Sequence, residues 1–186
     1  MKFDDYYSTV LREIKETLGE IDQTNITLFL KQIMNAQRIF IAGVGRTGMV
    51  MRCFAMRLMH LGIKVQILGD ITTTAVDRND LLLIGSGSGE TATLVSIAKK
   101  ANNLGVKTCL ITINPDSSIG NLAQECLKIP APSPKLSIKN EKKSIQPMGS
   151  LFEQTLLLTL ECIAGMIMKE KKLDSASMFE NHANLE

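Results

Sequence analysis

Residues 81–91 read LLLIGSGSGET, an apolar run that leads directly into small polar residues. The stretch Leu81 to Gly85 is short and apolar throughout, which is typical of a strand that is buried on both faces of a sheet. A helix is expected from about 90 to 104, and Gly105 is its stop. A strand, a glycine-rich turn and a helix in succession predict one unit of an α/β sheet.

The turn from Ser86 to Thr91 has the composition of a phosphate cradle, completed by Gly87, Gly89 and Glu90. Glycines let the backbone approach an anion closely, and N–H groups at a helix start carry partial positive charge. The hydroxyls of Ser86, Ser88 and Thr91 add donors without net charge. A Gly-Lys-Ser/Thr ending is missing, which excludes a nucleotide-triphosphate loop. We predict a site for a phosphorylated small molecule, with a sugar phosphate favoured; the alternative is a flexible turn with Ser88 as N-cap.

The alternation of short apolar runs and helical patterns continues on both sides of this unit. Further strands are expected at 38–42, 64–68, 107–111 and 125–129, and further helices at 4–18, 23–35, 44–61 and 149–169. These elements predict a three-layer, doubly wound sheet of five parallel strands, with helices on both faces. In such sheets ligands bind at the carboxyl ends of the strands, near the switch point of the strand order.

We assign residues 1–186 to a single domain, because this length suits one sizeable hydrophobic core. Its parts are N-terminal helices (1–36), an α/β core (37–130), a loop (130–147), and a long helix with a C-terminal tail (148–186). The loop is rich in proline and lysine and has no periodicity. Two alternatives stay open for this loop, a mobile lid and a plain linker.

Composition points to a soluble protein of the cytoplasm. The net charge of +2 is too small for a chain that coats nucleic acid or a membrane. The N-terminus lacks the apolar core of a signal peptide, and the apolar stretch 156–168 is too short to span a bilayer. The two histidines have no metal-ligand spacing, and the scattered cysteines favour reduced thiols. The cysteines are Cys53, Cys109, Cys126 and Cys162.

A second glycine-rich loop, GVGRTG at 43–48, also follows a strand and opens a helix. It is a literal GxGxxG, and Asp70 ends the next strand, where a dinucleotide site would place its ribose acid. A nicotinamide or flavin enzyme is therefore a rival hypothesis. Arg46 and Thr47 inside the loop suit a small phosphorylated ligand equally, and two adjacent loops could grip one sugar phosphate.

Two further residues are candidates for acid–base chemistry. Ser150 and Glu153 match the capping-box pattern S-x-x-E, so Glu153 could simply cap the long helix. The helix is otherwise very apolar, so its first turn could instead place a partly desolvated carboxylate against a pocket, as a general base. Taken alone, His182 in the C-terminal tail is typical of a solvated residue.

Several stretches together resemble the sugar isomerase (SIS) domain, and more closely the 6-phospho-3-hexuloisomerase family. SGSGET is shared by many SIS proteins, whereas QPMGSLFEQ and HANLE are far more specific to the hexuloisomerases. The stretches are GVGRTG (43–48), FAMRLMHLG (54–62), GSGSGET (85–91), IQPMGSLFEQ (145–154) and HANLE (182–186). They span the chain from end to end.

The resemblance implies an isomerase that interconverts D-arabino-3-hexulose 6-phosphate and D-fructose 6-phosphate through an enediol, in the ribulose monophosphate pathway of formaldehyde fixation. It implies no metal or organic cofactor, a homo-oligomer with a tetramer expected, and functional coupling to a hexulose-phosphate synthase. Glu153 matches the family's general base, and Ser86, Ser88 and Thr91 match phosphate ligands. His182 matches a histidine that, in related sugar isomerases, reaches a neighbour's active site.

The chain departs from the family pattern after the second strand, where the family often reads Gly-Glu-x-x-Thr-Pro. Here the sequence is GDITTT at 69–74, with a shorter carboxylate and no proline. Because of this departure, it stays open whether residues 69–74 make the contacts that the corresponding loop makes in the family. Two alternatives to the hexuloisomerase remain: a non-catalytic sugar-phosphate-binding SIS module, and a different SIS sugar-phosphate isomerase.

Overall fold

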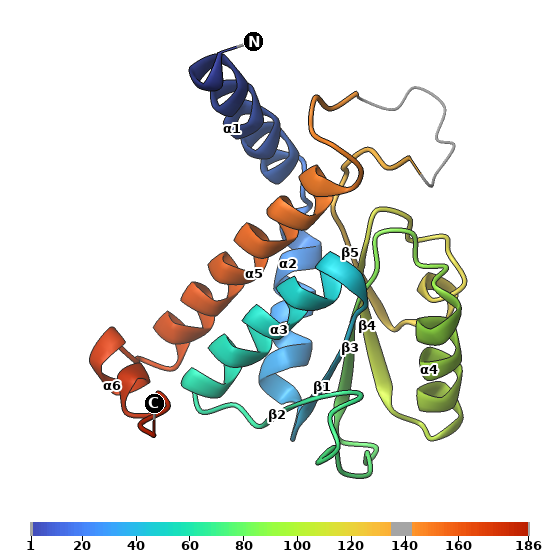
Figure 1. Ribbon diagram of the computed structural model, residues 1–186. Coiled ribbons are helices and arrows are strands. Elements are labelled where there is room, and N and C mark those ends of the chain that lie inside the picture. Colours follow the sequence, from blue (N-terminus) through green and yellow to red (C-terminus); the bar gives the residue numbers. More distant parts are fainter. Residues whose placement is uncertain (1, 135–142, 186) are drawn as a thin grey trace.

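The computed structural model describes residues 2–134 and 143–185 (Figure 1). Residues 135–142 lie outside the described part, so the choice between a lid and a linker for 130–147 stays open. Every predicted helix and strand is present, with ends that differ from the expected ones by at most two residues. A short 3₁₀ helix at Gly120–Leu122 and the helix Ser175–Phe179 in the C-terminal tail are additional.

Five parallel strands form the sheet: β1 Ile39–Ala42, β2 Val65–Ile67, β3 Leu81–Gly85, β4 Lys107–Thr112 and β5 Glu125–Lys128. Their order is β2-β1-β3-β4-β5, and all neighbours pair in parallel. The order reverses between β1 and β3, so this pair of strands is the switch point at which a ligand site is expected.

Helices cover both faces of the sheet, which confirms the predicted doubly wound α/β fold (Figure 1). One face carries most of the helices, and the other carries α4 with the 3₁₀ helix η1. The helices are α1 Phe3–Gly19, α2 Gln23–Asn35, α3 Gly45–His60, α4 Ala92–Asn103, α5 Ser150–Glu170 and α6 Ser175–Phe179.

Strand β1 shows how alternation divides the core. Ile39 and Ile41 pack into the cluster under α2, α3 and α5, whereas Phe40 and Ala42 pack into the cluster under α4. All four are at most 4% exposed. Burying each large side chain contributes about 1.5–3 kcal/mol, so both helical layers hold the sheet in place.

The long helix α5 is apolar and long enough to cross a membrane. The core helix of a soluble protein passes the same test, and half of its most apolar window is buried inside the fold. Leu156, Leu160 and Ile163 are at most 1% exposed, and Glu161 pairs with Arg57 of α3. The packing agrees with a buried core helix.

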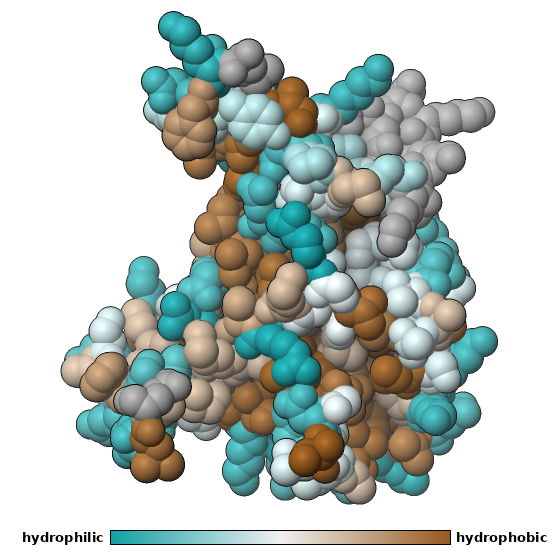
Figure 2. All heavy atoms as spheres, in the orientation of Figure 1, coloured by the Kyte–Doolittle hydropathy of each residue, from teal (hydrophilic) through white to brown (hydrophobic). Residues whose placement is uncertain are grey.

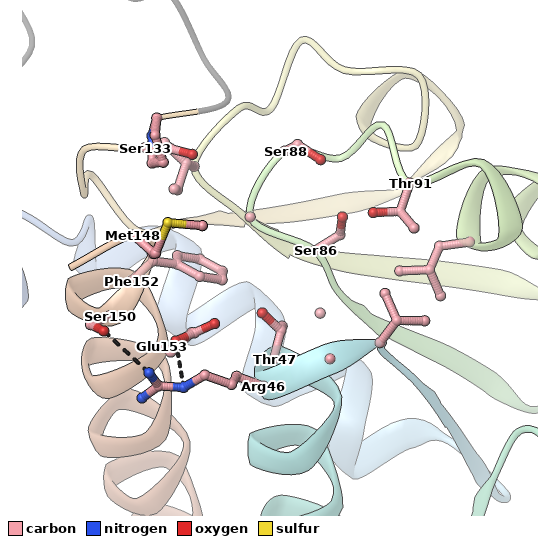
Figure 3. Close-up of a pocket in the computed structure, with 18 of the residues that line it drawn as sticks. Arg46, Thr47, Ser86, Ser88, Thr91, Ser133, Met148, Ser150, Phe152 and Glu153 are labelled. Carbon is pink, nitrogen blue, oxygen red and sulfur yellow. Dashed lines mark hydrogen bonds and ion pairs between the residues drawn. The ribbon is translucent and has the colours of Figure 1, made fainter.

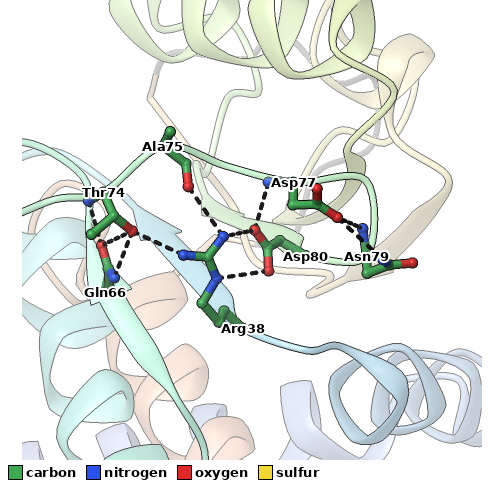
Figure 4. Close-up of polar contacts among 7 residues, drawn as sticks. All are labelled: Arg38, Gln66, Thr74, Ala75, Asp77, Asn79 and Asp80. Carbon is green, nitrogen blue, oxygen red and sulfur yellow. Dashed lines mark hydrogen bonds and ion pairs between the residues drawn. The ribbon is translucent and has the colours of Figure 1, made fainter.

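The loop that departs from the family pattern is anchored by a polar network (Figure 4). Arg38 donates two hydrogen bonds to the buried carboxylate of Asp80 (3.0 and 2.7 Å) and one to Thr74 Oγ1 (3.0 Å). The backbone N–H of Thr74 donates to Gln66 Oε1 (2.7 Å). Proline has no N–H, so this last bond depends on the residue that replaces the family's proline.

Candidate functional site

A cavity of about 380 Å³ lies at the carboxyl ends of β1 and β3, at the switch point of the sheet. Three segments line it: the loop and helix start at 44–47, the turn after β3, and the start of α5 (Figure 3). Loop residues Ser133 and Pro134 and the apolar Leu94 and Ile113 complete the wall. The structure therefore brings together the two glycine-rich loops and Glu153, which lie far apart in the sequence.

The predicted phosphate cradle forms one side of this cavity. Ser86, Gly87, Ser88 and Thr91 line it, and Thr91 is the N-cap of α4. The alternative with Ser88 as N-cap is therefore wrong; Ser88 Oγ accepts the N–H of Glu90 within the turn (3.2 Å). The first N–H groups of α4 follow Thr91 directly, so the helix places partial positive charge beside these hydroxyls.

Gly89 holds the shape of the cradle without lining the cavity. Its φ is +66°, and a Cβ there would lie 1.9 Å from Ser117 Oγ. Its N–H donates to Ser86 Oγ (3.1 Å). The next residue, Glu90, also lies outside the cavity's lining; its carboxylate accepts the N–H of Ser118 (2.7 Å). Side-chain and backbone hydrogen bonds from Ser118 hold the pKa of Glu90 below its ordinary value.

The second loop contributes Gly45, Arg46 and Thr47 to the opposite side. A Cβ on Gly48 would lie 2.6 Å from the carbonyl oxygen of Gly43, so the glycine pattern is explained by close packing of strand and helix. Asp70 lies away from this cavity and pairs with Arg52 at 3.0 Å. The acid that the dinucleotide hypothesis requires is therefore absent from the residues that line the described cavity.

Glu153 faces the cavity from the first turn of α5, with its side chain 16% exposed. Its carboxylate pairs with Arg46 Nε at 3.0 Å, and Arg46 also donates to Ser150 Oγ at 3.3 Å (Figure 3). The capping-box alternative for Glu153 is wrong, because Gly149 is the N-cap and Ser150 is already the first helical residue. Both side chains that would have capped the helix are directed to Arg46 instead.

The two ends of the cavity differ in chemistry (Figure 3). Hydroxyls and helix N–H groups gather at the cradle, while a carboxylate and a guanidinium meet at the start of α5. Phe152 and Met148 form an apolar wall between the polar groups. Such an arrangement can anchor a dianion at one end and exchange a proton at the other.

The C-terminal tail, which contains His182, follows α6, and Figure 1 shows α6 and the C-terminus at the end of α5 away from α1, whereas Glu153 lies in the first turn of α5. The ring of His182 stacks on His60 and Phe179, with centroids 5.4 and 5.3 Å apart. Burial lowers the pKa of His60, with smaller contributions from His182 and Arg57. Since α5 has 21 residues at about 1.5 Å each, His182 cannot reach the cavity of its own chain. Its role in a neighbour's site stays a prediction.

Several residues that line the site have no chemical signal of their own in the sequence. Ser133 comes from an aperiodic loop, and Met148 and Phe152 look like ordinary apolar residues next to a helix start. Met148, Ser150 and Phe152 belong to the family-specific stretch 145–154, but no feature of the stretch marks them as lining a cavity. Among residues 2–134 and 143–185, no cluster of three metal-ligating side chains occurs, and the absence of a metal requirement stays a prediction.

Comparison with known proteins finds relatives that match over most or all of the chain. The family model described as SIS domain matches residues 32–158. A Bacillus subtilis (strain 168) protein named 3-hexulose-6-phosphate isomerase is 44% identical over 186 residues, covering all of both chains. A Mycobacterium gastri protein of the same name is 37% identical and covers 96% of this chain and 89% of its own length.

A solved structure is similar over nearly the whole chain. It is a Methanococcus jannaschii protein whose crystal structure was described as inferring the function of a 3-hexulose-6-phosphate isomerase. The two structures align with a TM-score of 0.84 at 34% identity, covering 98% of this chain and 99% of that chain.

Proposed function

This chain belongs to the SIS domain family, and we propose that it is an isomerase that interconverts D-arabino-3-hexulose 6-phosphate and D-fructose 6-phosphate. The observation that carries the proposal is the shared cavity, in which the Glu153 carboxylate and Arg46 lie across from a cradle of hydroxyls. The names of two relatives that match over the full or nearly the full length support 3-hexulose 6-phosphate as the substrate. We further propose that residues 1–186 form one SIS domain.

The reaction moves a carbonyl from C3 to C2 of the sugar. Glu153 removes the C2 proton to give a 2,3-enediol, and a proton is then returned to C3. One carboxylate can serve both carbons when they lie on the same face. The C6 phosphate is anchored by Ser86, Ser88 and Thr91, which orients the reacting carbons C3 and C2, three and four bonds from C6. No metal or organic cofactor is needed for this sequence of steps.

Arg46 has two roles in this mechanism. Its Nε pairs with Glu153 at 3.0 Å, and its side chain is 58% exposed, so it can turn toward a ligand. Negative charge develops on the sugar oxygens in the enediolate, and a guanidinium placed beside them stabilises it. The transfer of the hydroxyl proton between O2 and O3 needs a second group, for which we propose His182 of a neighbouring chain.

We propose that the protein is a homotetramer. Large apolar side chains are exposed along α1, α3 and α5, and Figure 2 shows hydrophobic residues gathered along α5. They include Phe3, Leu11, Met49, Met56, Leu158 and Met166. Light scattering at micromolar concentration should give four times the chain mass of 20.5 kDa. A monomer that is fully active would contradict both the tetramer and the shared role of His182.

The cellular setting is also part of the proposal. We propose a cytoplasmic enzyme without nucleic-acid or membrane partners. It is coupled to a hexulose-phosphate synthase, because that reaction supplies its ketose substrate. Its pathway is the ribulose monophosphate route of formaldehyde fixation.

A coupled assay tests the activity. Formaldehyde, ribulose 5-phosphate and a hexulose-phosphate synthase are supplied, and fructose 6-phosphate is measured with and without this protein. Fructose 6-phosphate should form only when the protein is present. Binding of the sugar phosphate without turnover would instead favour a non-catalytic sugar-phosphate-binding module.

A further inference from the structure

Helix α1 carries a buried carboxylate that the proposed mechanism does not use. Glu13 is 9% exposed, although it belongs to a residue class that is rarely buried without partners. It accepts three hydrogen bonds, from Ser144 Oγ (2.7 Å), the Ile145 N–H (3.0 Å) and Gln146 Nε2 (3.0 Å). All three donors come from consecutive residues more than 130 positions away in the sequence. Because one short segment supplies all three hydrogen-bond donors to this buried carboxylate, the carboxylate fixes the geometry of that segment.

A second contact ties the same segment to the same face of α1. The hydroxyl of Tyr6 donates to the carbonyl of Ile145 at 3.3 Å. Tyr6 and Glu13 are seven residues apart, which places them on one side of the helix, two turns from each other. Within the segment, Ser144 Oγ accepts the N–H of Gln146 at 3.0 Å. Helix α1 therefore holds residues 144–146 by both side chains and backbone.

This segment leads directly into the catalytic end of α5. After Gln146 come Pro147, Met148 and Gly149, all of which line the cavity, and Glu153 follows in the first turn of α5. Met148 has a φ of +55°, a backbone conformation that residues other than glycine rarely adopt. Such a residue persists only where its surroundings hold it. The anchored residues 144–146 fix the chain on the N-terminal side of Met148.

We propose that Glu13 is a positioning residue, which fixes the entry of α5 so that the Glu153 carboxylate faces the phosphate cradle. This inference rests on the proposed isomerase function and deepens it. The cradle belongs to the β3–α4 turn and lies outside the hydrogen-bond network of Glu13. Loss of Glu13 should therefore slow the proton transfer without weakening the phosphate anchor.

The first test is Glu13→Ala in the full chain, compared with Glu16→Ala. Glu16 lies one turn further along α1 and, among the described residues, makes only an exposed pair with Arg12. We expect Glu13→Ala to lower kcat about 10²-fold, the usual effect of a displaced catalytic group. Inhibition by inorganic phosphate should be unchanged, and Glu16→Ala should behave as wild type. Each variant is assayed at a temperature at which circular dichroism shows it folded.

A conservative variant separates positioning from charge. In Glu13→Gln the amide oxygen can still accept from Ile145, and the amide nitrogen can donate to Gln146 Oε1 after that side chain rotates. Gln146 Oε1 is buried and has no hydrogen-bond partner among the described residues. We therefore expect Glu13→Gln to recover most of the kcat lost in Glu13→Ala. Gln146→Leu removes one of the donors to Glu13 and should also lower kcat. In the double variant with Glu13→Ala, the loss of kcat should be smaller than the product of the two single losses, because both substitutions break the same network.

Three results would overturn the inference. The first is a folded Glu13→Ala variant with wild-type kcat, and the second is a parallel loss of kcat and phosphate affinity, which would mean general destabilisation. Should Glu13→Ala fail to fold, a Gln146→Leu variant with unchanged kcat would be the third.

If the wild type lacks isomerase activity, the proposed function fails, and hydrogen exchange of the backbone amides then tests whether Glu13 anchors residues 144–146. The Ile145 amide should lose its protection from exchange in Glu13→Ala, while the amides of 86–91 keep theirs.

Discussion

At the scale of single residues, Glu153 is the side chain on which the proposed chemistry depends. Its carboxylate is nearly buried, faces the cavity and is paired with Arg46 rather than with the helix backbone. We expect Glu153→Gln to lower kcat by about 10²–10⁴-fold, because a general base contributes that much. The coupled assay measures it, with folding checked by circular dichroism. A variant that turns over normally would remove Glu153 from the mechanism.

The cradle depends on Gly89 for two separate reasons. Its positive φ disfavours any other residue, and a Cβ would collide with Ser117 Oγ. Gly89→Ala should therefore displace the Ser86 and Ser88 hydroxyls and raise the KM for fructose 6-phosphate at least tenfold. Gly19→Ala is the control, because a Cβ at Gly19 meets nothing within 4 Å among the described residues. Unchanged inhibition by inorganic phosphate in Gly89→Ala would argue against the cradle.

Glu13 makes stability depend on pH in a defined direction. Burial acts to raise its pKa, but the hydrogen bonds from Ser144, Ile145 and Gln146 outweigh burial and hold the pKa below the ordinary value of 4.5. The carboxylate therefore stabilises the fold above pH 4.5, and this contribution is lost as the pH falls through the lowered pKa. Urea unfolding of wild type and Glu13→Gln should differ most near neutral pH and converge in acid. A difference that stayed constant down to pH 3 would contradict this.

At the scale of elements, the connection from β2 to β3 is held by the pair of Arg38 and Asp80. The Asp80 side chain is fully buried and Arg38 is 25% exposed. We expect Asp80→Ala to lower the free energy of unfolding by about 2–4 kcal/mol, because it removes the buried carboxylate that accepts two hydrogen bonds from Arg38 and one from the Asp77 N–H. The folded variant should keep its kcat, since the network lies away from the cavity.

A matched ion pair provides the control for that element. Asp70 pairs with Arg52 at 3.0 Å, but both side chains are about half exposed. Asp70→Ala should change the free energy of unfolding by less than about 1 kcal/mol. Equal effects of the two substitutions in denaturant unfolding would mean that burial does not distinguish them.

At the scale of the whole molecule, the strand order creates the site. Because β1 and β3 are neighbours and their crossovers lie on opposite faces, the loops after both strands open into one space. Helix α5 packs alongside α3, and its first turn brings Glu153 to the same space. The cavity is thus lined by three segments that lie far apart in the sequence.

The elements themselves were determined by local sequence. Apolar runs such as LLLIG at 81–85 and glycine stops such as Gly105 predicted each strand and helix to within two residues. The fold class follows from their alternation, since only parallel strands covered on both faces satisfy such apolar runs. The cradle composition of 86–91 and the candidacy of Glu153 were likewise visible in the sequence.

Only the tertiary structure decided what the polar groups contact. The S-x-x-E pattern left open whether Glu153 caps the helix or faces a pocket. In the structure Gly149 is the N-cap, and both Ser150 and Glu153 contact Arg46, which lies over 100 residues away in the sequence. Glu13 has no local signal at all, because its three donors follow a long aperiodic loop. Local periodicity encodes which side chains avoid water. The partner of a buried charge depends on which distant segments the packed sheet and helices bring within hydrogen-bond distance.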